Sequence, residues 1–167
     1  PFDERFHASI ALYPYCVFTF PNNAETETPL LTITGRDDYL TPDAACRTIY
    51  SKFFRNDNKI KFISMENARH GFDNPFLYFG FTFDKLPNLK IINKECTLTI
   101  NKNGEINNME GILINTPEMS EYFLNKCSFK GVTVKYNSQA TKKTLNEVKQ
   151  FFNEKLINKG FKLVEVL

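Results

Sequence analysis

The stretch from residue 30 to residue 42, LLTITGRDDYLTP, decides the fold that the sequence predicts. Its first five residues are apolar or β-branched without interruption, which is typical of a strand buried on both faces of a parallel sheet. A loop with two adjacent acids follows. Thr41 is suited to cap the start of a helix, and Pro42 to occupy its first position. The stretch therefore predicts a strand, a loop and a helix, the repeating unit of an α/β fold.

The segments on either side extend this pattern. Residues 8–13 (ASIALY) form a short apolar run that ends at Pro14, and residues 59–65 (KIKFISM) form another after the helix. Four apolar side chains of the helix recur at a spacing that places them on one face. They are Cys46, Ile49, Tyr50 and Phe53. We predict three parallel strands and one helix within residues 1–75.

Residues 76–131 follow a different pattern. The pair Asn103-Gly104 lies between TLTIN and a stretch that continues to ILIN, which predicts a hairpin with a type I′ turn. Thr116 and Pro117 then predict a second capped helix, which ends near Cys127. We interpret this region as an inserted hairpin-and-helix excursion, a lid or a side subdomain.

Residues 132–167 close the chain with a predicted helix from about residue 141 to residue 156. Its apolar positions form one stripe, so we expect the helix to pack back on the sheet. The stripe consists of Leu145, Val148, Phe152 and Leu156.

The composition is that of an ordinary globular domain. The chain has 167 residues, of which 42% are hydrophobic and 24% charged, and a net charge of +2. This charge is too small to predict a nucleic-acid or membrane partner. No apolar run reaches the roughly 20 residues that span a bilayer, and no signal peptide is recognisable. The chain opens on Pro1 rather than Met, which fits a processed product, a truncated chain or a broken gene.

The four cysteines are Cys16, Cys46, Cys96 and Cys127, and they contain no CxxC pair. Zinc is therefore not expected, and nothing else in the sequence calls for a metal or an organic cofactor. Disulfides Cys16–Cys46 and Cys96–Cys127 are as consistent with the sequence as four buried thiols. Two disulfides fit an exported protein, periplasmic or secreted, and four thiols fit a cytoplasmic one. Export is slightly favoured.

Asp38 and His70 are the candidate catalytic residues. Each lies on a loop that follows a predicted parallel strand, and such loops meet at the carboxyl edge of a sheet, where active sites gather. An acid and a histidine are two members of a nucleophile–histidine–acid triad, in which the histidine deprotonates the nucleophile and the carboxylate orients the ring. The other histidine, His7, precedes a strand and is expected to be structural. Asp73 is expected to brace the loop of His70.

The third member of a triad is not recognisable. A nucleophile elbow needs glycines two residues before and two residues after the Ser or Cys, because its strained turn tolerates no bulk. No serine and no cysteine of this chain has that context. We therefore expect the nucleophile to lie outside this chain.

Four stretches together carry a family resemblance. They are ALYPYC (residues 11–16), TPLLTITGRDDYLTPDAAC (28–46), ARHGFDNP (68–75) and GVTVKYNSQATKKTLNEVKQFFNEKL (131–156). In this order they resemble the C-terminal half of proteins of the dienelactone hydrolase family. The resemblance implies an α/β fold with an α/β-hydrolase-like parallel sheet, of which this chain carries the C-terminal half with the inserted excursion.

The resemblance also implies which residues act. The family's acid lies in a G-x-x-D-x-x-x-P motif, here Gly35, Asp38 and Pro42, and its histidine opens an H-G/A-F motif, here at His70. Counting back from Pro42 selects Asp38 over Asp37, which stays the alternative. The nucleophile would be a Ser or a Cys. It would lie, with the oxyanion-hole donors, on an N-terminal half that this chain lacks.

The implied function is hydrolysis of a small carboxylic ester or lactone without a cofactor. The missing half or a partner in a homo-oligomer is expected to be needed for activity. Tyr15, Tyr39 and Phe72 are candidates to line an acyl pocket, although each is equally suited to structural packing. The alternatives are an inactive fragment or interaction module, and a peptidase with the same acid and histidine.

Overall fold

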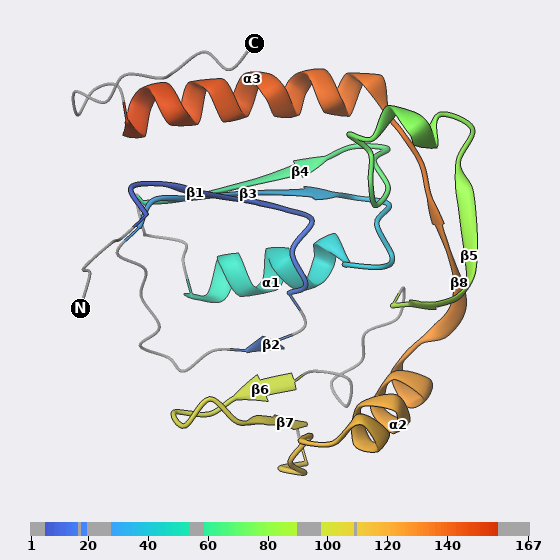
Figure 1. The fold of residues 1–167 in the computed structure, drawn as a ribbon. Helices are drawn as coiled ribbons and strands as arrows, with labels where there is room; N and C mark the ends of the chain where they lie inside the picture. Colours follow the sequence, from blue (N-terminus) through green and yellow to red (C-terminus); the bar gives the residue numbers. More distant parts are fainter. Residues whose placement is uncertain are drawn as a thin grey trace.

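The computed structural model describes residues 6–16, 18–19, 28–53, 59–89, 98–108 and 110–156. Its centre is a parallel sheet of three strands in the order β1 (Ser9–Leu12), β3 (Leu30–Gly35) and β4 (Ile60–Met65) (Figure 1). The middle strand β3 is buried almost throughout, whereas β1 and most of β4 are half-buried. This burial explains why β3 is the most continuously apolar or β-branched of the three.

Two helices cover the two faces of this sheet. Helix α1 (Asp43–Phe53) lies on one face and helix α3 (Ser138–Lys155) on the other (Figure 1). Alternation along β3 directs Leu31 and Ile33 toward α3, where they join an apolar core. Thr32 and Thr34 point the other way and bond to side chains of α1. The core on the α3 face is thus apolar, and the α1 face is partly polar.

The buried face of α3 differs from the predicted stripe. Leu145 is 54% exposed, so its place in that stripe is wrong. The buried side chains are Ala140, Thr144 and Phe151, with Val148 and Phe152 packed beside them. Neighbouring stripes on a helix differ by one residue in phase, and the apolar pattern alone did not distinguish them.

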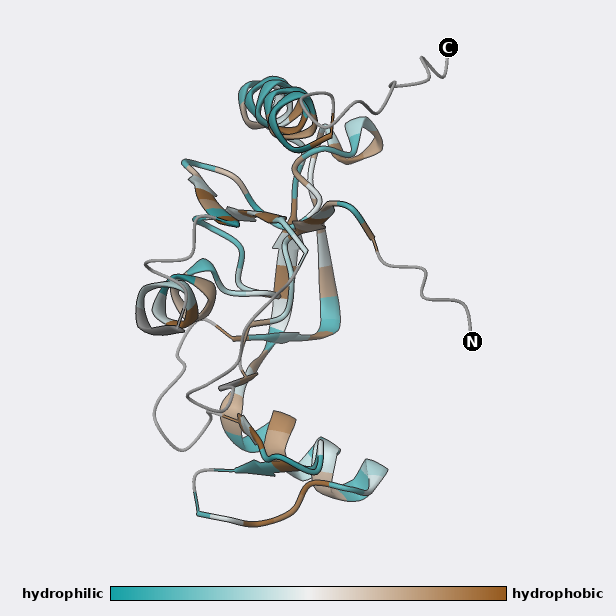
Figure 2. Cartoon of the chain, turned by 90° about the vertical axis from the view of Figure 1, so that its left-hand side faces the viewer, coloured by the Kyte–Doolittle hydropathy of each residue, from teal (hydrophilic) through white to brown (hydrophobic). Residues whose placement is uncertain are grey.

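The other five strands of the described structure form two small sheets apart from the central one. Strand β5 (Phe81–Asn88) pairs antiparallel with β8 (Phe129–Val134) as a two-stranded ribbon. A second sheet has the order β2 (Phe18–Thr19), β6 (Leu98–Ile100) and β7 (Ile106–Asn108), with helix α2 (Pro117–Cys127) beside it. Figure 2 shows this part separated from the central sheet and α3.

The prediction of an α/β-hydrolase-like sheet is therefore wrong. Among the residues that the structure describes, the parallel sheet has three strands, and the later strands do not extend it. The first six residues of β5 are exposed, and its register with β8 shifts between Phe83 and Pro87. A strand that is exposed in this way does not suit a sheet with helices on both faces. The predicted excursion therefore builds sheets of its own.

The details of the excursion confirm one prediction and correct another. Thr116 caps α2, because its hydroxyl accepts a hydrogen bond from the Met119 N–H. The predicted hairpin forms between β6 and β7, but the φ of Asn103 is not positive, so the turn is not of type I′. The side chain of Asn101 instead organises a longer loop, in which its Oδ1 accepts from the N–H groups of Asn103 and Glu105.

Exposed aromatic rings occur in the 3-10 turn η1 (Pro75–Leu77), in the residues between it and β5, and in the β5–β8 ribbon. Phe76 is 95% exposed and Phe79 93%, with Tyr78, Phe81, Phe83 and Phe129 also exposed. Clustered exposed apolar side chains are typical of surfaces that contact another molecule. In the described part of the chain, no helix is long and apolar enough to cross a bilayer.

Candidate active site

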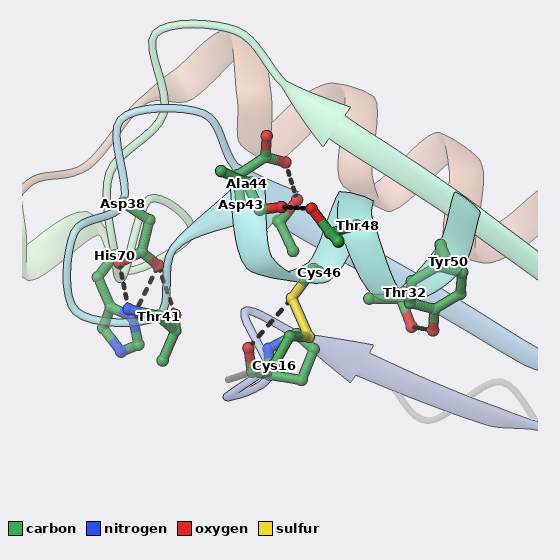
Figure 3. The surroundings of a disulfide bond; sticks show 12 residues. Cys16, Thr32, Asp38, Thr41, Asp43, Ala44, Cys46, Thr48, Tyr50 and His70 are labelled. Atoms are coloured by element: carbon green, nitrogen blue, oxygen red, sulfur yellow. Dashed lines mark hydrogen bonds and ion pairs between the residues drawn. A yellow bond between two sulfur atoms is a disulfide. The ribbon is translucent and has the colours of Figure 1, made fainter. Parts of the chain in front are cut away.

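Asp38 and His70 lie on the loops that follow β3 and β4, at the same edge of the central sheet. Oδ2 of Asp38 is 2.9 Å from Nδ1 of His70 (Figure 3). The Asp38 side chain is completely buried, whereas that of His70 is 25% exposed. The pair therefore has an enclosed carboxylate and a ring that reaches the surface.

The loop that carries Asp38 supplies most of its hydrogen bonds. Oδ1 accepts from the N–H groups of Leu40 and Thr41, both at 2.9 Å. Oδ2 accepts from the Thr41 hydroxyl at 2.7 Å, in addition to its contact with His70. A buried carboxylate is costly unless its oxygens are hydrogen-bonded, and these contacts satisfy both of them. The sequence predicted Thr41 as the cap of α1. Its hydroxyl instead donates its hydrogen bond to Asp38.

These contacts also determine which nitrogen of the neutral His70 ring carries the proton. The Thr41 hydroxyl oxygen is 3.2 Å from Nδ1, and its proton is donated to Asp38. Both neighbours of Nδ1 therefore present lone pairs, so Nδ1 carries the proton and the neutral ring keeps its lone pair on Nε2. No described residue forms a hydrogen bond with Nε2. The geometry is that of an oriented base whose basic nitrogen has no hydrogen-bond partner among the described residues.

Tyr13, the residue after β1, packs against the ring of His70. Its own ring lies 4.6 Å from that of His70 between centroids, and its hydroxyl donates to Oδ1 of Asp73. Its φ of 39° lies in the left-handed region, which is strained for a bulky residue and recurs at functional sites. Sequence reasoning missed Tyr13. The available signal was its position at the carboxyl end of a predicted parallel strand.

Gly35 explains how closely the loops of Asp38 and His70 approach each other. A Cβ at this position would lie 2.4 Å from the carbonyl oxygen of Ala68, so a side chain would push the loops apart. The backbones join directly, because the N–H of Asp37 donates to the same carbonyl at 2.9 Å. Glycine at the end of β3 therefore lets Asp38 reach the loop of His70.

The Tyr13 hydroxyl has a consequence for alkaline stability. Burial, together with the hydrogen bond to Asp73, raises the pKa of Tyr13 far above its ordinary value. As the pH rises, Tyr13 therefore loses its proton in the unfolded chain before it does so in the folded chain. The stability that the neutral Tyr13 hydroxyl contributes is present below about pH 10 and is lost as the pH rises above it. Tyr13→Phe should reduce the loss of unfolding free energy between about pH 8 and about pH 11, measured by urea denaturation.

Tyr122→Phe is the matched control for this prediction, because Tyr122 is 71% exposed on α2. It should leave the alkaline loss as in the wild type. An equal loss in wild type and Tyr13→Phe would contradict the role of the Tyr13 hydroxyl.

The remaining site candidates lie elsewhere. Phe72 is fully buried in the core on the α3 face, where its edge meets Tyr13, so it does not line a pocket. Tyr39 is half-buried, and its carbonyl accepts from the Leu89 N–H. Tyr15 is 39% exposed and contacts Phe18 at the side of β1. It is Asp38, and not Asp37, that bonds to His70.

The cysteines tie this region together. Cys16 and Cys46 form a disulfide that joins the loop after β1 to helix α1 (Figure 3). Cys127 is also disulfide-bonded, and Cys96 lies outside the described residues.

Within the described ranges, no group of three or more His, Cys, Asp or Glu side chains is placed to hold a metal ion. His7 is exposed before β1.

Comparison with known proteins finds no family model, no curated protein and no solved structure that matches this chain.

Proposed function

We propose that Asp38 and His70 are the acid and the base of a nucleophile–histidine–acid site that hydrolyses carboxylic esters or lactones. The observation that carries the proposal is the 2.9 Å contact between Asp38 Oδ2 and His70 Nδ1, while no residue in the described ranges forms a hydrogen bond with Nε2. In this orientation His70 can remove a proton from a group that faces Nε2, while Asp38 orients the ring. The resemblance of the two loops to those of the dienelactone hydrolase family supports an ester or a lactone as the substrate.

The chemistry follows from the protonation of the ring. Nε2 takes the proton of a Ser or Cys nucleophile as that group attacks the substrate carbonyl, and Asp38 stabilises the resulting imidazolium. The imidazolium then protonates the leaving alkoxide, which leaves an acyl group on the nucleophile. Water repeats the sequence with His70 as its base and releases the acid.

The nucleophile is proposed to belong to a polypeptide segment beyond these 167 residues. All serines of the chain lie in the described ranges, and none of them bonds to His70. Cys16, Cys46 and Cys127 are disulfide-bonded and therefore cannot attack a carbonyl. Oxyanion donors would come from the same outside segment.

The test uses the longest polypeptide that the reading frame around these residues encodes. It should hydrolyse p-nitrophenyl acetate and the lactone dihydrocoumarin, and His70→Ala should lower kcat by about 1,000-fold or more. His7→Ala is the control, because it removes a histidine from the surface near β1 without changing the site. A wild-type protein without ester or lactone turnover, or near-normal turnover by His70→Ala, would overturn the proposal.

A further inference from the structure

Tyr13 has a backbone conformation that the local sequence disfavours. Its φ of 39° lies in the left-handed region, and Pro14 follows it directly. A proline biases the residue before it toward extended conformations, and a bulky side chain is rarely found at positive φ. Within the described ranges Asn67 is the other non-glycine residue with a positive φ, and asparagine tolerates it. Backbone strain of this kind persists only where several contacts hold it in place.

The contacts that hold Tyr13 join it both to the sheet and to the loop of His70. Its N–H donates to the carbonyl oxygen of Ile33 at 2.8 Å, which extends the β1–β3 pairing by one residue. Its hydroxyl donates to Oδ1 of Asp73, and its ring meets Phe72 edge-on with 5.5 Å between centroids. Phe72 is fully buried in the core, so the Tyr13 ring rests on a fixed neighbour. Tyr13 is thus held at its backbone, at the end of its side chain and along its ring.

The polar contacts of the His70 ring all lie at one corner. Asp38 and Thr41 both approach the same atom, Nδ1 (Figure 3). A histidine ring moves by rotation about two side-chain bonds, and contacts at one corner do not fix both rotations. The Tyr13 ring lies 4.6 Å from the His70 ring between centroids, at an interplanar angle of 53°, so it blocks the movement of the ring toward that side. The direction of Nε2 therefore depends on Asp38 and Tyr13 together.

We infer that Tyr13 is a positioning residue for His70. With its hydroxyl anchored on Asp73, its ring fixes the plane of the imidazole and thereby the direction in which Nε2 accepts a proton. Tyr13 itself takes no part in the proton transfer, because its hydroxyl proton is donated to Asp73. The inference rests on the proposed function for its effect on turnover, whereas the order of the His70 ring is a property of this chain alone.

The first test is carbon-13 NMR relaxation of the His70 ring in the 167-residue chain. The order parameter of the ring C–H bonds should be about 0.85 in the wild type and fall below about 0.6 in Tyr13→Leu, the values of rigid and flexible groups. The ring proton should stay on Nδ1 in both proteins, because Asp38 and Thr41 are unchanged. Tyr13→Phe keeps the aromatic ring and loses the anchor, so its order parameter should lie between the two. Equal order parameters in wild type and Tyr13→Leu would overturn the inference.

Tyr50→Leu is the matched control for this measurement. Tyr50 is also half-buried, but it stacks on Phe62 and bonds to Thr32 on the α1 face of the sheet. The control should leave the order of the His70 ring as in the wild type, which separates a local effect from a general loosening of the fold. A fall in the control as large as that in Tyr13→Leu would contradict the positioning role.

Asp73→Ala tests the anchor and decides the matter if Tyr13→Leu does not fold. It removes the acceptor of the Tyr13 hydroxyl and leaves both rings in place. Its order parameter for the His70 ring should fall to the value of Tyr13→Phe. A value equal to that of the wild type would overturn the inference.

The second test follows hydrolysis of p-nitrophenyl acetate by the longer polypeptide. Tyr13→Leu should lower kcat about 100-fold and leave KM within about twofold, because a misplaced base slows the chemical step without changing substrate binding. Tyr13→Phe should recover about tenfold of that loss. Loss of ring order in Tyr13→Leu, together with a wild-type polypeptide that hydrolyses no ester, would refute the proposed function and leave the positioning role standing. An undiminished kcat of Tyr13→Leu in an active polypeptide would overturn the inference.

Discussion

Asp38→Asn is expected to lower kcat for ester hydrolysis by about 10,000-fold in the longer polypeptide that is proposed to carry the nucleophile. The carboxylate accepts hydrogen bonds from Leu40, Thr41 and His70 at once. An amide has one oxygen and an NH2 group, which can only donate. If the oxygen stays with the backbone N–H groups, the NH2 group faces His70. Nδ1 must then accept, the ring proton moves to Nε2, and the base is lost.

The prediction has a readout that needs no turnover. Nitrogen NMR of the wild-type chain should show His70 protonated at Nδ1, and Asp38→Asn should show the proton at Nε2. Asp37→Asn is the matched control, because it removes the same charge from the same loop without a bond to His70. An Asp38→Asn protein that keeps the Nδ1 proton, or a kcat within tenfold of the wild type, would contradict the assigned role of Asp38.

Phe151→Ala is expected to destabilise the fold by about 3–5 kcal/mol. Phe151 is 1% exposed and packs in the core between α3 and the central sheet, with Leu31, Ile33 and Phe72. Truncation leaves a cavity that the surrounding strands cannot fill, so the transfer free energy and the packing are both lost. Urea denaturation measures the change in unfolding free energy.

Leu145→Ala is the control for this experiment, on the same helix. Leu145 is 54% exposed, so its truncation should cost less than about 1 kcal/mol. Both variants place Ala in α3 and gain similar helix propensity, so the difference reports burial. Equal losses in the two variants would contradict the orientation of α3 on the sheet.

The sequence predicted the elements whose patterns are local. The unbroken run of β3, the presence of α1 and the capped α2 depend on neighbouring residues, and the structure has all three. The predicted cap of α1 at Thr41 is wrong, because α1 begins at Asp43 and the Thr41 hydroxyl donates to Asp38. The proximity of Asp38 and His70 could also be predicted from sequence, because neighbouring parallel strands bring the loops that follow them to one edge of the sheet. The sequence did not show which side of α3 faces the sheet, since several apolar residues of this helix fit more than one stripe.

The extent of the central sheet was decided by tertiary structure. Strand β5 pairs with the distant strand β8, with Asn88 opposite Phe129 and Phe81 opposite Val134, and the rings of Phe81 and Phe83 stay exposed. Strand pairing over such separations depends on which edges are available, and no local pattern encodes it. The hydrolase-like sheet was implied by the family resemblance, and among the described residues the parallel sheet has only β1, β3 and β4.

The sequence by itself determined which acid and which histidine lie together: Asp38 and His70, on the loops after β3 and β4. Tertiary structure alone decided how that pair is held. It placed the Thr41 hydroxyl between the two side chains and the strained Tyr13 against the ring. The physical reason is that these contacts join residues from three separate strand ends, and their geometry exists only once the strands have packed.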